Sequence, residues 1–155
     1  MYPLFRKPLF LIVDSINAQP FKNFPNRFGQ PFVCFLSPLA LPSIFHDLQN
    51  HQGSIFTLFL SNSLLGFCYI CQIKEIAKDI LIKCQSLLKN IYFEIAKSFY
   101  RSRSIDQVYI QFCRDDILRA LIFRYVFCYT ALRLHRGFKV LILNYLNFHL
   151  IIINN

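Results

Sequence analysis

Tryptophan is absent from this chain of 155 residues, and glycine is scarce, with 4 residues at positions 29, 53, 66 and 137. A P-loop and a dinucleotide-binding loop each need several glycines within one short stretch, so both are excluded. No Gly-x-Ser-x-Gly motif occurs either, which removes the usual nucleophile turn of hydrolases. We therefore expect no enzymatic activity, no catalytic residues and no cofactor.

Charged residues are also few, at 16% where about 25% is typical. Their balance is basic, because 17 Lys+Arg face 8 Asp+Glu and give a net charge of +9. Hydrophobic residues make up 55%, which excludes disorder as a description of the whole chain. A basic and apolar chain favours an acidic membrane surface. We therefore expect a lipid membrane as partner and location, do not expect nucleic acid, and leave any protein partner unidentified.

Proline is missing from residues 43–155, since all 7 prolines lie within the first 42 residues. Proline breaks helix interiors and disfavours the helical conformation of the residue before it. The sequence therefore predicts an extended or irregular segment rich in proline and aromatic residues over residues 1–45. Residues 46–155 form a predicted helical region, so the fold class is mostly α.

A run of 19 residues without charge, 55–73, is the best candidate for a membrane span. Its length is close to the ~20 residues that cross a hydrocarbon core. Ser61, Asn62 and Ser63 lie at its middle and offset part of the gain from insertion, because buried polar groups need partners. A buried segment of a globular core is the alternative interpretation.

Residues 74–103 have the pattern of an amphipathic helix. At ~100° per residue, seven apolar side chains fall on one face. These are Ile76, Ile80, Cys84, Leu87, Ile91, Ile95 and Phe99. Together they form one apolar face. It could bind a membrane surface or a partner, or pack on the core of its own chain.

A further helix is predicted over residues 115–136. Asp115 and Asp116 stand at its start, whereas Arg133, His135 and Arg136 stand at its end. This is the order of charges that the helix dipole favours. Two arginines within the apolar middle, Arg119 and Arg124, disfavour insertion into a bilayer, so we expect a core helix.

One group of side chains has the composition of a metal site: His46, His51, Cys68 and Cys71. Two imidazoles and two thiolates can hold zinc tetrahedrally. The order resembles the His-His-Cys-Cys zinc module of retroviral-type integrases, in which the gap between the two pairs is longer. Because the cysteines lie in an apolar run, where they usually act as small hydrophobic side chains, we expect no metal there.

Nucleic-acid binding depends on residues 97–104, Lys-Ser-Phe-Tyr-Arg-Ser-Arg-Ser. Its basic side chains could contact phosphates while Phe99 and Tyr100 stack on bases. A solvated helix end is the alternative explanation.

Three hypotheses for the function follow. The leading one is a small, basic, membrane-associated helical protein without enzymatic activity. The second is an open reading frame that was never selected, because the low glutamate and high Phe, Leu and Ile content is also what an opposite-strand reading produces. The third is a basic module that binds nucleic acid or a protein partner.

Overall fold

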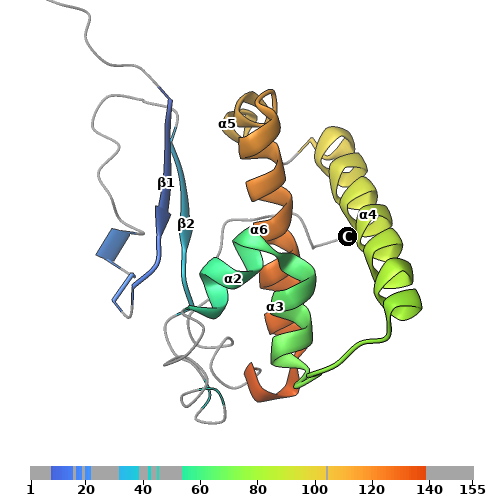
Figure 1. Cartoon of the computed structure of the whole chain (residues 1–155). Coiled ribbons are helices and arrows are strands. Elements are labelled where there is room, and N and C mark those ends of the chain that lie inside the picture. The colour runs from blue at the N-terminus through green and yellow to red at the C-terminus, as the bar shows by residue number, and fades with distance from the viewer. Residues whose placement is uncertain are drawn as a thin grey trace, which may run out of the picture.

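The computed structural model describes residues 8–15, 17–18, 20–21, 32–38, 42, 45, 54–103 and 105–138. Within them the chain is mostly helical, as the sequence predicts (Figure 1). In chain order the elements are strands β1 (Leu9–Val13) and β2 (Phe32–Leu36), helices α2 (Ile55–Ser61), α3 (Ser63–Ile70), α4 (Lys78–Arg101), α5 (Gln107–Phe112) and α6 (Asp116–Leu134), and the 3-10 turn η3 (Arg136–Phe138).

The two strands lie in the segment predicted to be irregular, and that prediction is not confirmed. β1 and β2 form a parallel pair in which Leu9 lies opposite Phe32 and Val13 lies opposite Leu36. Both strands consist of apolar, mainly branched or aromatic residues, which favour the pleated conformation. The prolines at positions 8 and 31 precede the strands and interrupt neither of them.

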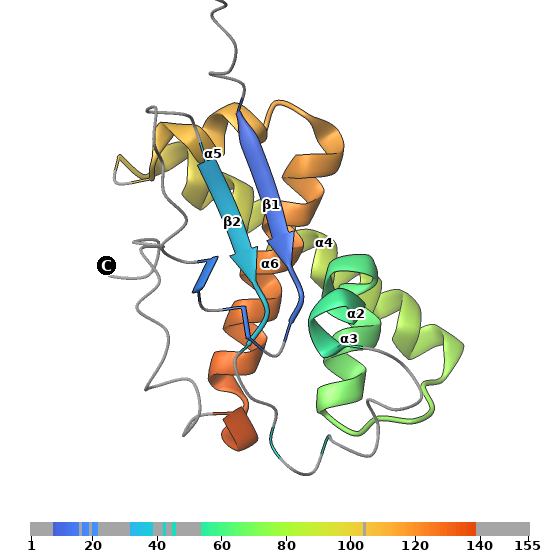
Figure 2. The same ribbon diagram turned by 90° about the vertical axis from the view of Figure 1, so that its left-hand side faces the viewer.

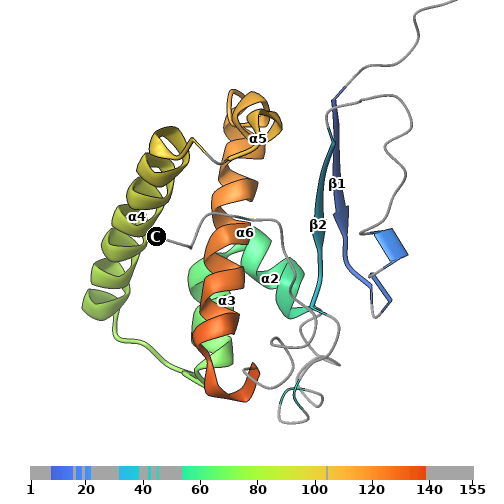
Figure 3. The same cartoon turned by 180° about the vertical axis from the view of Figure 1, so that it is seen from behind.

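Helix α6 occupies the centre of the molecule, with the strand pair on one side and α4 on the other (Figures 1 and 3). It begins where the Asp115 side chain accepts hydrogen bonds from the backbone N–H groups of Ile117 and Leu118, both at 2.9 Å. Such a cap satisfies N–H groups that have no partner within the helix.

An aromatic cluster joins the strands to α6. The Phe35 ring of β2 stacks on Tyr125 of α6, with centroids 3.9 Å apart, and meets Phe10 of β1 edge-on at 4.9 Å. Phe10 also contacts Phe112 of α5 at 5.3 Å. The hydrophobic core therefore draws on residues from both sides of position 45.

The apolar run 55–73 is not one helix but two, because Asn62 interrupts it. Asn62 has an extended backbone (φ −144°, ψ 92°) and its side chain accepts a hydrogen bond from the N–H of Leu65. It thereby caps α3 while its own N–H bonds back to Leu58 and closes α2. The polar residues at the middle of the run are thus a helix boundary.

The predicted membrane span is consequently wrong. In the part of the chain that the structure describes, no helix has both the length and the apolar character needed to cross a bilayer. α2 and α3 have 7 and 8 residues, against the ~20 that a span requires.

The close approach of α2 and α3 depends on Gly66. A Cβ at this position would lie 2.7 Å from Phe59 Cγ and 3.1 Å from Phe59 Cα, and Phe59 is fully buried. We expect Gly66→Ala to lower the free energy of unfolding by about 1–3 kcal/mol, because it overpacks the contact. Urea denaturation measures the change. Leu65→Ala, at a half-exposed neighbour, is the control and should cost less; equal costs would show that the contact is not tight.

Candidate interaction site

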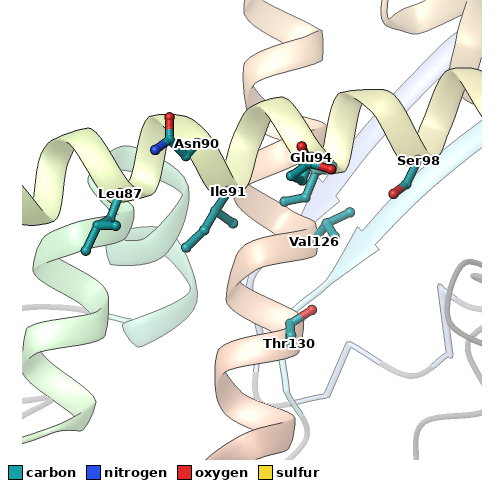
Figure 4. Close-up of a pocket in the computed structure, with 8 residues that line it drawn as sticks. Leu87, Asn90, Ile91, Glu94, Ser98, Val126 and Thr130 are labelled. Atoms are coloured by element: carbon teal, nitrogen blue, oxygen red, sulfur yellow. The ribbon is translucent and has the colours of Figure 1, made fainter.

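A groove lined mainly by apolar surface lies between α4 and α6. It has a volume of about 550 Å³. Leu87 and Ile91 project from α4 on the side where Val126 and Thr130 of α6 lie (Figure 4). The lining residues are Leu87, Asn90, Ile91, Glu94, Ile95, Ser98, Val126 and Thr130.

The apolar face predicted over residues 74–103 lies on α4 except for Ile76, and we call its seven side chains the α4 stripe. Only one flank of the α4 stripe is packed against the core. Phe99 is 1% exposed, and its ring meets Phe123 of α6 and Tyr109 of α5. Ile95 is partly buried against the same core.

The other flank of the stripe, nearer the start of α4, is uncovered. Ile80, Leu87 and Ile91 are 50%, 61% and 43% exposed. A helix of this length with such a strong apolar face normally buries that face against another element. The stripe therefore contains an apolar surface that the described residues leave without cover.

The polar side chains around the groove are nearly neutral as a set. Glu94 is the one charged residue that lines it, and Lys97 balances this carboxylate through an ion pair at 3.0 Å. Lys97 also lies 5.6 Å from the centre of the Phe93 ring. No lysine or arginine is among the lining residues, so the groove suits an uncharged apolar group and not a phosphate.

A partly buried polar network connects α2, α4 and α6 beside the groove. Arg124 of α6 donates hydrogen bonds to the backbone carbonyls of Leu60 at 2.8 Å and Ser61 at 3.0 Å. These carbonyls close α2, where they have no partner within the helix. Burial raises the pKa of Tyr92 on α4, and hydrogen bonds with Ser63 and Arg124 partly oppose this rise. The sequence interpretation considered Arg124 only as an obstacle to membrane insertion.

A second polar cluster lies at the carboxyl ends of the two strands. The Asp14 carboxylate accepts hydrogen bonds from Ser54 Oγ at 3.0 Å and Thr57 Oγ1 at 2.5 Å. Ser37 Oγ accepts from the Ser15 N–H and donates to the Ser15 carbonyl. Ligands of parallel sheets often bind at this end of the strands. Here the hydroxyls instead tie β1 to α2 and to the residue after β2.

The residues considered for zinc are not assembled by the described structure. His46 and His51 lie outside the described residues. Cys68 is buried in α3 and Cys71 is exposed at its end. Burial raises the pKa of both thiols, which disfavours the thiolate that binds metal. No group of three potential metal ligands occurs within the described residues.

The stretch considered for nucleic-acid contact, residues 97–104, contains both buried and exposed side chains. Phe99 is buried in the core and cannot stack on a base, whereas Tyr100 is 63% exposed. Lys97 is engaged by Glu94. Arg101 and Arg103 are exposed beside Tyr100, so part of the basic and aromatic stretch stays accessible, and nothing in the described structure tests whether it binds nucleic acid.

Comparisons with known proteins identify relatives over nearly the whole chain. The profile of the family described as "Protein SCAI" matches residues 1–138. Protein SCAI of Mus musculus and Protein SCAI of Homo sapiens are each 46% identical over 139 residues, which cover 90% of this chain and 23% of the relative. The Protein SCAI homolog of Dictyostelium discoideum is 33% identical over 140 residues, or 90% of this chain and 18% of the relative. No solved structure matches.

These matches and the fold correct the earlier hypotheses. An unselected reading frame would not be 46% identical to a known protein over 139 residues, so that interpretation is wrong. The hypothesis of a membrane-associated protein with a transmembrane helix, and with it the membrane location, is also wrong. The division of residues 55–73 into two short helices and the family match both contradict it. The chain spans about a quarter of the length of the Mus musculus and Homo sapiens relatives. Since the family profile covers residues 1–138, this chain belongs to the SCAI family.

Proposed function

We propose that this chain is a binding region within a longer protein of the SCAI family, where it packs against another segment of that protein, and that it has no catalytic role. In this proposal the groove between α4 and α6 receives an apolar helix from the remainder of the family chain. The uncovered flank of the α4 stripe is the observation that carries the proposal.

The spacing of the exposed side chains supports a helix as the occupant. Ile80, Leu87 and Ile91 lie on one side of α4 at intervals of two turns and one turn. Side chains of this spacing form a ridge that fits the groove of a second helix. Burying each of them completely stabilises a complex by about 1.5–3 kcal/mol, less the fraction that is already covered.

The source of that helix is supported by the size of the relatives. The match covers 23% of the Mus musculus relative, so more than three-quarters of that chain lies outside it. The lining of the groove has no cation and carries little net charge, which favours an apolar protein segment over nucleic acid.

The surroundings of two buried cysteines and of Asp14 support the proposal that the chain has no catalytic role. Burial raises the pKa of the Cys113 thiol despite the nearby Arg119, and burial also raises the pKa of Cys128. Neither thiol is thereby activated as a nucleophile. The Asp14 carboxylate is occupied by two hydroxyl donors.

A chimaera tests the proposed function. Residues 1–138 of this chain replace the matched residues of the Mus musculus relative, and the unfolding of the chimaera is compared with that of the isolated chain. We expect Leu87→Asp to destabilise the chimaera by about 1.5–3 kcal/mol more than it destabilises the isolated chain, because a charge would enter a buried contact.

The matched control is Ile82→Asp. Ile82 is 57% exposed on the same helix but does not line the groove. This substitution should cost the same in both proteins. If Leu87→Asp also costs the same in both, the groove holds no segment of the longer chain and the proposal fails.

A further inference from the structure

The outer edge of β1 is a second surface that has no partner among the described residues. The N–H of Ser37 donates to the Val13 carbonyl at 2.9 Å, in register with the parallel pairing of β1 and β2. Backbone groups of alternate residues in a strand point to opposite edges. The groups of Leu9, Leu11 and Val13 therefore face β2, and those of Phe10 and Ile12 face the opposite edge.

No hydrogen-bond partner for this edge exists among the described residues. β1 pairs with β2 alone, and no other backbone hydrogen bond reaches Phe10 or Ile12 in the part of the chain that the structure describes. Figure 2 shows the two strands side by side, with β1 forming one border of the pair. The far edge of β2 differs, because the Leu36 backbone hydrogen-bonds to the hydroxyl of Tyr125.

The sequence of β1 lacks the features that keep an edge strand from pairing with a further strand. Natural edge strands usually carry a lysine, a proline, a bulge or an inward-pointing charge that prevents further pairing. β1 reads Leu-Phe-Leu-Ile-Val and has none of these residues. Its apolar character on both faces is typical of an inner strand of a parallel sheet, which is covered on both sides. Ile12 is nevertheless 39% exposed.

We propose that β1 is an inner strand of a larger sheet and that a third strand pairs along Phe10 and Ile12. This strand comes from the remainder of the family chain. A two-stranded sheet is marginal by itself, and more than three-quarters of the Mus musculus relative lies outside the matched residues. The proposal is independent of the α4–α6 groove, because it concerns a different element and a different face.

Amide hydrogen exchange, resolved by residue, tests the proposal in the chimaera described above and in the isolated chain. We expect the amides of Phe10 and Ile12 to exchange at least about tenfold more slowly in the chimaera, because they become hydrogen-bonded there. The Leu11 amide is the matched control, since it already faces β2, and should change less. Slow exchange in α6 in both proteins shows that the shared core is folded.

A pair of substitutions separates pairing from burial. Ile12→Pro removes the edge N–H, whereas Ile12→Ala shortens the side chain and keeps the N–H. Proline is tolerated on a strand edge that faces solvent. We therefore expect Ile12→Pro to lower the urea midpoint well below that of Ile12→Ala in the chimaera, with a smaller difference in the isolated chain.

Two results would overturn the proposal. One is fast exchange of Phe10 and Ile12 in a folded chimaera, together with an equal difference between the two variants in both proteins. The other is protection of the same amides in the isolated chain that rises with its concentration, because a second copy of the chain would then be the partner. Loss of the groove contact in the Leu87→Asp chimaera would leave these amides protected, so the two proposals can fail separately.

Discussion

Phe35→Ala is expected to lower the free energy of unfolding by about 3–5 kcal/mol, the usual cost of deleting a buried phenyl ring. Phe35 is 1% exposed and stacks on Tyr125 with an interplanar angle of 2°. It also holds the edge-on contact with Phe10 that brings β1 onto the helices. Urea denaturation followed by far-UV circular dichroism measures the loss.

Phe93→Ala is the matched control, because Phe93 is 65% exposed on α4. It should cost less than about 1 kcal/mol, as surface substitutions usually do. A cost for Phe35→Ala no greater than that of Phe93→Ala would mean that the strand pair does not pack on α6 in solution.

Arg124→Met should lower the free energy of unfolding by about 2–3 kcal/mol, because hydrogen bonds made by charged groups contribute about 1.5–3 kcal/mol. Methionine keeps much of the apolar stem and removes the two bonds to the Leu60 and Ser61 carbonyls. These carbonyls are then left without their donor at the end of α2. Thermal and urea unfolding measure the effect.

Arg133→Met is the comparison for this prediction. Arg133 is exposed in the last turn of α6, where a cation stabilises the helix dipole by only about 0.3–1 kcal/mol. If both substitutions cost the same, the bonds of Arg124 to α2 contribute nothing to stability.

Signals close to each other in the sequence predicted the two long helices, α4 and α6, but neither the division of residues 55–73 nor α5. The aspartates and basic residues that bracket residues 115–136 correspond to α6, which the structure places at Asp116–Leu134. The helical period of residues 74–103 corresponds to α4 at Lys78–Arg101. Ile76 is the one member of the stripe that precedes the helix, because the backbone of Ala77 is extended. Capping and periodicity suffice here since each is set within a few turns.

The strands had a signal that the proline distribution obscured. Leu9–Val13 and Phe32–Leu36 are five-residue apolar runs bordered by proline on the N-terminal side. Prolines outside a strand are compatible with pairing, whereas the prediction left the whole segment extended or irregular and assigned no strand within it. The parallel pairing itself joins residues far apart in the chain and has no local signal.

The two open surfaces could not be predicted, because each depends on how elements pack. The sequence defines the α4 stripe but not which flank of it meets α6. Val126 and Thr130, on the other wall of the groove, belong to a helix whose pattern indicates only a core position. The break at Asn62 likewise depends on a specific contact, the hydrogen bond that the Asn62 side chain accepts from the N–H of Leu65 at the start of α3. The apolar pattern of the run is equally compatible with one uninterrupted helix.

Hydroxyl-radical footprinting of the α4 side chains tests the central claim most directly. Modification of Leu87 and Ile91 is compared with that of Ile82 and Phe93, in the isolated chain and in the chimaera with the remainder of the Mus musculus relative. We expect all four side chains to be modified in the isolated chain, since each is more than 40% exposed. In the chimaera Leu87 and Ile91 should become protected while Ile82 and Phe93 stay reactive. Equal modification of Leu87 and Ile91 in both proteins would contradict the account.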